Sequence, residues 1–265
     1  MIFDTHAHYD DPSFSEDREE LLQALAPAGV GRVINVGCCV ASSFDCVEMA
    51  RQYDFMYSTV GVHPDDTADL LEEDLITLKA LARKNLYRDG AAGKVVAIGE
   101  IGYDFYRDDH VAEEVQRRWF EAQLEMANEL DLPVIIHSRK AAQMTYETLK
   151  AFKTGDGAGI MHCYGYSVEM ARQYLNLGYY IGLGGVVTFK NARVAKEVAA
   201  YVPQDRLLIE TDCPYISPTP LRGTRNDSRN LHYVVKALAE IRGVTEEEIE
   251  RTTWENACRL YRIEA

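Results

Sequence analysis

Eight short apolar segments alternate with longer amphipathic segments along this chain of 265 residues, and the alternation predicts an α/β protein, a (β/α)8 TIM barrel. Short continuous apolar strands are typical of a parallel sheet that is buried on both faces. Eight strand–helix units within about 250 residues match the usual size of such a barrel. We therefore expect a single domain over residues 1–265, with an additional C-terminal helix.

The expected strands are the apolar, β-rich runs of the sequence. They lie at Ile2–His6, Arg32–Val36, Met56–Val62, Val95–Ile101, Val134–His137, Gly159–His162, Tyr179–Leu183 and Leu207–Glu210. Between these runs, apolar residues recur at steps of three and four, which indicates helices with one buried face. The first such pattern comprises Leu21, Leu22, Leu25 and Ala28, and the fourth comprises Val115, Trp119, Ala122, Met126 and Leu130.

Two helices are expected after the eighth strand. The first runs from Asn226 to Arg242 and carries on one side Leu231, Val234, Val235, Leu238 and Ile241. The last begins at the capping box Thr245-Glu246-Glu247-Glu248 and turns inward Ile249, Thr253, Ala257 and Leu260. A doubly wound open sheet is the alternative fold, but Gly182-Leu183-Gly184-Gly185 lacks the glycine spacing of its phosphate-binding turn.

The composition is that of a globular enzyme with an acidic surface. Asp and Glu number 42 against 28 Lys and Arg, which opposes nonspecific attraction to nucleic acid or to an anionic membrane. A polyanionic substrate therefore needs a local basic patch. The sequence shows neither a signal peptide nor a long apolar stretch, and its six cysteines contain no C-x-x-C pair. We expect reduced thiols, a cytoplasmic location and no membrane partner.

Most of the seven histidines fall where expected strands end. These are His6, His8, His63, His137 and His162, and two carboxylates, Glu100 and Asp212, share such positions. Residues two apart in a strand project to the same side, so His6 and His8 converge. Barrel enzymes carry their chemistry at this rim, and imidazole with carboxylate is a typical ligand set for a divalent ion. A histidine bonded to a backbone carbonyl is the alternative at any one position, but five imidazoles at one rim favour a metal site.

Six motifs, in this order, resemble the signatures of the TatD family of metal-dependent hydrolases. They are Asp4-Thr5-His6-Ala7-His8, Gly61-Val62-His63-Pro64, Ile98-Gly99-Glu100-Ile101-Gly102-Tyr103-Asp104, His162-Cys163, Glu210-Thr211-Asp212-Cys213-Pro214-Tyr215 and Arg222-Gly223-Thr224-Arg225-Asn226. The resemblance covers essentially the whole chain and implies an amidohydrolase-type barrel. It implies one ion on His6, His8 and Asp212, a second on His137 and His162, and Glu100 bridging both.

The resemblance implies hydrolysis of DNA phosphodiester bonds, with a 3′–5′ exonuclease as one form of that activity. Two divalent ions, Mg, Mn or Zn, activate a water in such a site, and Asp212 acts as the general base beside the bridging Glu100. Hydrolysis of a small amide, a cyclic amide or another ester is the alternative. Many barrel relatives with that activity bridge their ions with a carboxylated lysine, but Lys94 stands at the wrong end of the fourth strand. A mononuclear deaminase and a metal-stabilised binding protein without turnover are further alternatives.

Loops after the strands carry side chains suited to a nucleic acid. Arg139, Arg222 and Arg225 are expected to contact phosphates. His63 is expected to be a further substrate-binding residue. Tyr103 and Tyr164 are expected to stack on bases of a single-stranded or frayed DNA end. The alternative is that these aromatic rings pack beneath loops and that the arginines pair with nearby carboxylates. We expect a monomer.

Three loop positions depart from the pattern of the family. Asp65 stands where the family often has a second histidine after His-Pro. Tyr164-Gly165-Tyr166 replaces a common Phe-Ser-Gly, and Asn226-Asp227-Ser228 replaces Asn-Glu-Pro. None of these residues is an implied metal ligand, but the loops are expected to meet the substrate. The departures therefore leave the identity of the substrate open.

Overall fold

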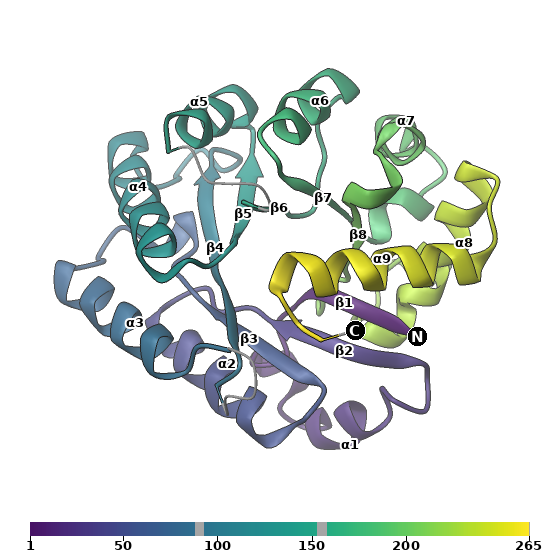
Figure 1. Ribbon diagram of the computed structural model, residues 1–265, viewed down its shortest axis with the longest axis horizontal. Helices are drawn as coiled ribbons and strands as arrows, with labels where there is room; N and C mark the ends of the chain where they lie inside the picture. The colour runs from purple at the N-terminus through teal and green to yellow at the C-terminus, as the bar shows by residue number, and fades with distance from the viewer. Residues whose placement is uncertain (88–92, 153–157, 265) are drawn as a thin grey trace.

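Within the residues described by the computed structural model, 1–87, 93–152 and 158–264, eight parallel strands form one sheet whose order follows the sequence (Figure 1). The strands are β1 Ile2–Ala7, β2 Val30–Asn35, β3 Met56–Val60, β4 Val95–Asp104, β5 Val134–Arg139, β6 Gly159–Met161, β7 Tyr180–Leu183 and β8 Leu207–Ile209. Each strand pairs with the next, and helices between them surround the sheet. This nearly closed barrel confirms the predicted fold class.

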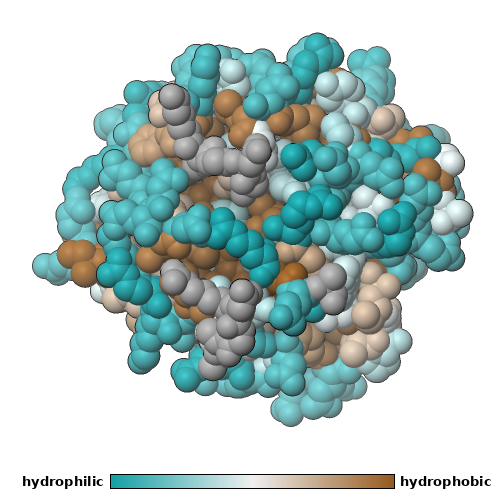
Figure 2. All heavy atoms as spheres, in the orientation of Figure 1, coloured by the Kyte–Doolittle hydropathy of each residue, from teal (hydrophilic) through white to brown (hydrophobic). Residues whose placement is uncertain are grey.

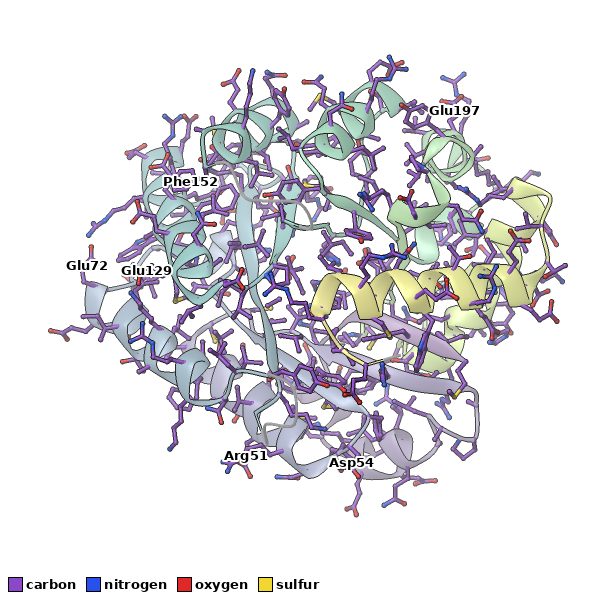
Figure 3. All side chains as sticks on the ribbon, in the orientation of Figure 1. Arg51, Asp54, Glu72, Glu129, Phe152 and Glu197 are labelled. Atoms are coloured by element: carbon purple, nitrogen blue, oxygen red, sulfur yellow. The ribbon has the colours of Figure 1, made fainter. Side chains whose placement is uncertain are left out.

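The helices cover the outside of the barrel and direct their charged residues away from it. They are α1 Arg18–Gln23, α2 Val40–Gln52, α3 Glu72–Lys84, α4 Glu113–Leu130, α5 Ala142–Phe152, α6 Val168–Asn176, α7 Arg193–Tyr201, α8 Leu231–Arg242 and α9 Glu246–Tyr261. Figure 3 shows Glu72 and Glu129 projecting from the outer surface, where Glu72 pairs with Arg118 and Glu129 with Lys79. Short 3-10 helices lie at η1 Pro12–Phe14, η2 Pro64–Asp66, η3 Gly185–Thr188, η4 Gln204–Arg206 and η5 Ser228–Asn230.

The interior of the barrel is filled by a cluster of apolar side chains that α9 covers. Phe3, Ile160 and Leu208 pack with Tyr261 of α9 in this cluster. Figure 1 shows α9, in yellow, running across the barrel, and it packs on β1 and β8. The hydroxyl of Thr245 accepts a hydrogen bond from the amide of Glu248, which confirms the predicted start of this last helix. One end of the barrel is thus closed, and the other end is left for a site.

Several element boundaries differ from the predicted ones. β4 continues to Asp104 because it stays paired with β5, with Asp104 opposite Arg139. α1 ends at Gln23, so Leu25 and Ala28 lie in turns rather than in the helix. Residues 226–227 precede the helical region instead of beginning it, because the Asp227 side chain accepts from the amide of Arg229 and caps η5.

The surface is mainly polar on the face that α9 occupies, where hydrophilic side chains predominate (Figure 2). Within the described part of the chain, no helix is long and apolar enough to span a bilayer. All six cysteines are free thiols.

Candidate metal centre

One end of the barrel collects all the predicted metal ligands. They come from strands or from the residues directly after strands: His6 and His8 from β1, Glu100 from β4, His137 from β5, His162 after β6 and Asp212 after β8. His63, which follows β3, joins them. The first six residues are buried or nearly buried, so their donor atoms face one another rather than bulk water.

On the β1 side of the centre, two imidazoles face two carboxylates. The Nε2 atoms of His6 and His8 lie 3.0 Å apart. His6 Nε2 lies 3.4 Å from Glu100 Oε2, and His8 Nε2 lies 3.5 Å from Asp212 Oδ1. His8 Nδ1 lies 2.9 Å from the carbonyl oxygen of Val36, which can only accept, so Nδ1 carries the proton. His8 Nε2 is therefore the ring nitrogen that is left to bind a cation, in place of a proton.

On the β5 side, His137 and His162 face the other oxygen of Glu100. His137 Nδ1 lies 2.7 Å from Glu100 Oε1, and His162 Nε2 lies 3.8 Å from the same oxygen. His162 Nε2 also lies 3.6 Å from Asp212 Oδ1, and its Nδ1 lies 3.1 Å from Glu210 Oε1. Glu100 thus lies between two groups of histidines and directs one oxygen to each.

The donor set fits a divalent cation. Three groups of ligand atoms each lie within 4.8 Å of one another: His6, His8 and Glu100; His6, His162 and Asp212; and His63, Asp104 and His137. Buried imidazole nitrogens and carboxylate oxygens that converge in this way are the ligands that zinc, manganese and similar ions prefer.

Comparison with known proteins agrees with the geometry. The family model described as TatD related DNase matches residues 3–262. The chain belongs to the TatD family. It is 42% identical over 263 residues to the uncharacterized metal-dependent hydrolase YabD of Bacillus subtilis, covering 99% of this chain and 100% of YabD. The resemblance inferred from the motifs is confirmed, and the protein is a metal-dependent hydrolase.

Two further TatD relatives span almost the whole chain. The 3′-5′ ssDNA/RNA exonuclease TatD of Cronobacter sakazakii is 32% identical, over 98% of this chain and 97% of that protein. The crystal structure of YjjV, a TatD homologue from Escherichia coli K12, has a TM-score of 0.91 at 32% identity. That comparison covers 99% of this chain and 98% of YjjV, so it confirms the barrel independently of the motifs.

The histidines of this TatD-family centre differ in charge because their neighbours differ. Burial opposes a charge on His137, yet hydrogen bonds to Asp104 and Glu100 raise its pKa to about 9. Burial also opposes a charge on His162, but nearby Glu210 and Glu100 raise its pKa to about 9. Burial and the neighbouring His162 instead lower the pKa of His6 to about 4. Without a cation, protons on His137 and His162 therefore offset the carboxylates.

The two central carboxylates are both ionised at neutral pH. Burial alone would raise the pKa of Glu100, but the nearby His6 and His162 lower it well below its usual value. Burial would likewise raise the pKa of Asp212, and the neighbouring imidazoles of His8 and His162 lower it below its usual value. The Asp212 side chain is 18% exposed against 5% for Glu100. Asp212 is thus the carboxylate that a substrate can approach.

Asp104 is a site residue that the sequence reasoning missed. Its Oδ2 lies 2.9 Å from His137 Nε2, and its Oδ1 accepts from the amide of Tyr106 at 2.7 Å. Asp104 lies four residues after Glu100 in β4, and strand alternation places such residues on one face. The four-residue spacing of Glu100 and Asp104 could have indicated that both belong to the site. That inference needs a strand that continues past Ile101, where the predicted strand ended.

The two tyrosines predicted to stack on bases lie inside the protein. Tyr103 is fully buried, and its hydroxyl pairs with Thr148 at 3.0 Å. Tyr164 is 5% exposed, and its hydroxyl donates to the carbonyl oxygen of Ser167 at 2.8 Å. These positions correct the interpretation of both rings as stacking platforms, because a buried ring offers no face to a base.

The predicted arginines differ in whether their charge is paired with a carboxylate or stacked on an aromatic ring. Arg225 donates two hydrogen bonds to the carboxylate of Asp17, at 2.8 and 2.5 Å. Arg139 is exposed, and its guanidinium lies 3.6 Å from the ring centroid of Tyr106. Arg222 is also exposed and lies 4.2 Å from the ring centroid of Phe189. A stacked guanidinium keeps its charge available to an anion, whereas the charge of Arg225 is already paired.

Proposed function

We propose that this TatD-family hydrolase cleaves phosphodiester bonds at single-stranded or frayed ends of nucleic acid, with two divalent ions at the centre. The residues that would hold them are His6, His8 and Asp212 for one ion, His137 and His162 for the other, and Glu100 for both. The observation that carries this proposal is the position of Glu100, which directs Oε2 to His6 and Oε1 to His137.

Divalent ions at such a centre supply an activated water and offset the charge that develops on the phosphate. The negative charge of Glu100 would reduce the repulsion between two bound cations. Asp212 has a second task besides holding one ion, because it is ionised and partly exposed. We assign it the role of general base, which accepts a proton from the attacking water and passes it to the leaving oxygen.

The substrate class is supported by the rim of the site and by a relative. Tyr106 is 51% exposed and stacks against Arg139, while its backbone amide is bonded to Asp104 beside His137. This pair offers a ring face to a base and a cation to a phosphate. The Cronobacter relative is named a 3′-5′ ssDNA/RNA exonuclease. The net charge of −14 repels polyanions over most of the surface, so a nucleic acid needs a local cation such as Arg139 to bind.

The position of Lys94 bears on the amide-hydrolysing alternative. Its Nζ donates to the carbonyl oxygens of Tyr53 and Asp54, at 3.2 and 2.8 Å, where β4 begins. It is therefore remote from the histidines and cannot bridge ions as a carboxylated lysine, which leaves that task to Glu100.

The proposal is tested by measuring bound metals and then assaying the metal-loaded protein on several substrates. We expect two ions per chain and cleavage of single-stranded DNA or RNA and of a chromogenic phosphodiester, abolished by a chelator. Glu100→Gln, which keeps the shape but removes the charge, should lose or weaken one ion and reduce activity. Hydrolysis of amides without cleavage of any phosphodiester would contradict the proposed function.

A further inference from the structure

His63 is the imidazole at the rim that the six-residue ligand set does not use. The chain around it is held firmly at the end of β3. The amide of Val62 donates to Gln123 Oε1 at 2.7 Å, and Gln123 Nε2 donates back to the Val62 carbonyl at 3.2 Å. The amide of His63 itself donates to the carbonyl oxygen of Cys38 at 2.7 Å. These hydrogen bonds hold the backbone at His63 in place, so the position from which its ring extends toward the centre is fixed.

The backbone determines which nitrogen of His63 carries the proton. The amide of Asp65 donates to His63 Nδ1 at 3.2 Å, so Nδ1 is an acceptor and has no proton. An imidazolium has protons on both nitrogens and cannot accept this bond, so the ring is neutral with its proton on Nε2. His8 is the opposite case, because its Nδ1 donates to the carbonyl oxygen of Val36 and its Nε2 is the nitrogen left to bind a cation.

The protonated nitrogen of His63 faces the centre and is open to a ligand. His63 Nε2 lies 3.9 Å from Glu100 Oε1, which is beyond hydrogen-bond range. The ring lies edge to face with His137 at a centroid distance of 4.3 Å, and the side chain is 16% exposed. Within the described parts of the chain, no acceptor lies at hydrogen-bond distance from Nε2. An N–H group in this position can bind an oxygen that a substrate brings in.

We propose that His63 is a neutral hydrogen-bond donor to a non-bridging oxygen of the substrate phosphate, and not a ligand of a further ion with Asp104 and His137. The proposal rests on the proposed function, because it takes a phosphate ester as substrate. A nitrogen that carries a proton has no lone pair for a cation. A neutral imidazole is too weak an acid to release its proton at neutral pH, so Nε2–H acts as a preorganised dipole that stabilises negative charge.

The tautomer can be measured without any assumption about the substrate. In protein labelled with 15N in its histidines, nitrogen NMR distinguishes a protonated from an unprotonated ring nitrogen, and the signals missing from His63→Gln assign this residue. We expect the Nε2–H form in both the ion-free and the metal-loaded protein. An Nδ1–H form, with Nε2 bound to a cation, would overturn the proposal.

The role of the donor is tested with inorganic phosphate as the probe. His63→Ala should weaken phosphate binding to the metal-loaded protein by about 10- to 100-fold, the usual effect of removing a hydrogen bond to a charged group, with metal content unchanged. His63→Gln should retain most of the affinity, because its amide nitrogen takes the place of Nε2 and still donates. The matched control is His232→Gln, an exposed histidine whose Nδ1 pairs with the carbonyl oxygen of Arg229.

The outcomes separate this proposal from the proposed function. Loss of one ion in a folded His63→Ala variant would show that His63 is a metal ligand. An unchanged phosphate affinity of that variant would show that His63 does not bind phosphate. Either result overturns the proposal even if phosphodiesters are cleaved. A wild-type protein that cleaves amides but neither binds phosphate nor cleaves phosphodiesters would refute the proposed function and the phosphate assignment together, while the NMR signals would still decide the tautomer. Thermal unfolding shows whether each variant is folded.

Discussion

Asp4 of β1 is hydrogen-bonded to Thr211, which lies just after the last strand, β8. The hydroxyl of Thr211 donates to Asp4 Oδ2 at 2.6 Å, and its amide donates to Asp4 Oδ1 at 3.0 Å. Ser228 adds a further hydrogen bond to Oδ2 at 2.6 Å. Nearby, the amide of Asp212 donates to the carbonyl oxygen of His6 at 2.9 Å. One buried carboxylate thus fixes the distance between two chain segments that each carry a predicted metal ligand.

Asp4→Asn should loosen this junction. The replacement has one acceptor atom where the carboxylate has two, so at least one of the donors Thr211 and Ser228 loses its partner inside the protein. We expect the free energy of unfolding to fall by about 1–3 kcal/mol and metal to dissociate faster. Chemical denaturation and metal-release rates measure the two effects. Asp54→Asn, at an exposed position labelled in Figure 3, is the matched control and should change neither.

Asp212→Asn separates catalysis from structure. Asparagine keeps the size and one oxygen of the side chain but cannot accept a proton. If Asp212 is the general base, kcat should fall by roughly 10²- to 10⁴-fold, with the melting temperature nearly unchanged. Steady-state kinetics and thermal unfolding on metal-loaded protein decide the matter. A variant that keeps most of its kcat, or one that unfolds much earlier, would show that Asp212 serves the structure rather than the reaction.

Metal affinity should rise with pH over the neutral range. In the ion-free protein the pKa values of His137 and His162 are about 9, so both rings carry an extra proton at neutral pH. A cation that binds these nitrogens must displace protons, and the displacement becomes easier as the pH approaches 9. Titration calorimetry in two buffers of different ionisation enthalpy should detect the released protons. Affinity that is constant between pH 6 and 8 would show that these rings bind no cation.

Arg222 and Arg225 should differ in their effect on nucleic-acid binding. Arg222→Gln removes a cation that keeps its charge available, so it should weaken oligonucleotide binding and reduce the salt slope by about 0.7 or less, with little effect on a small chromogenic ester. Arg225→Gln removes a cation already paired with Asp17, so it should leave the slope nearly unchanged. Binding measured over a range of salt concentrations compares the two. Equal changes in slope would show that the ion pair opens for the substrate.

The sequence by itself determined which residue types reach the rim. The carboxyl ends of parallel barrel strands meet at one end, so the strands that the apolar runs predict bring His6, Glu100 and His137 together. The period of a strand also explained why His6 and His8 converge. These inferences succeed because each depends on the local period of the chain and on one general property of barrels.

Only the tertiary structure decided which atoms face one another. Arg225 pairs with Asp17, more than 200 positions earlier in the chain, and no local pattern relates the two. Tyr103 lies in β4 with Glu100, and its buried hydroxyl pairs with Thr148 of α5, which is 45 positions later in the chain. The proton position on His63 depends on a single backbone amide, that of Asp65. Such properties depend on distances of a few ångströms between atoms, which a one-dimensional period does not contain.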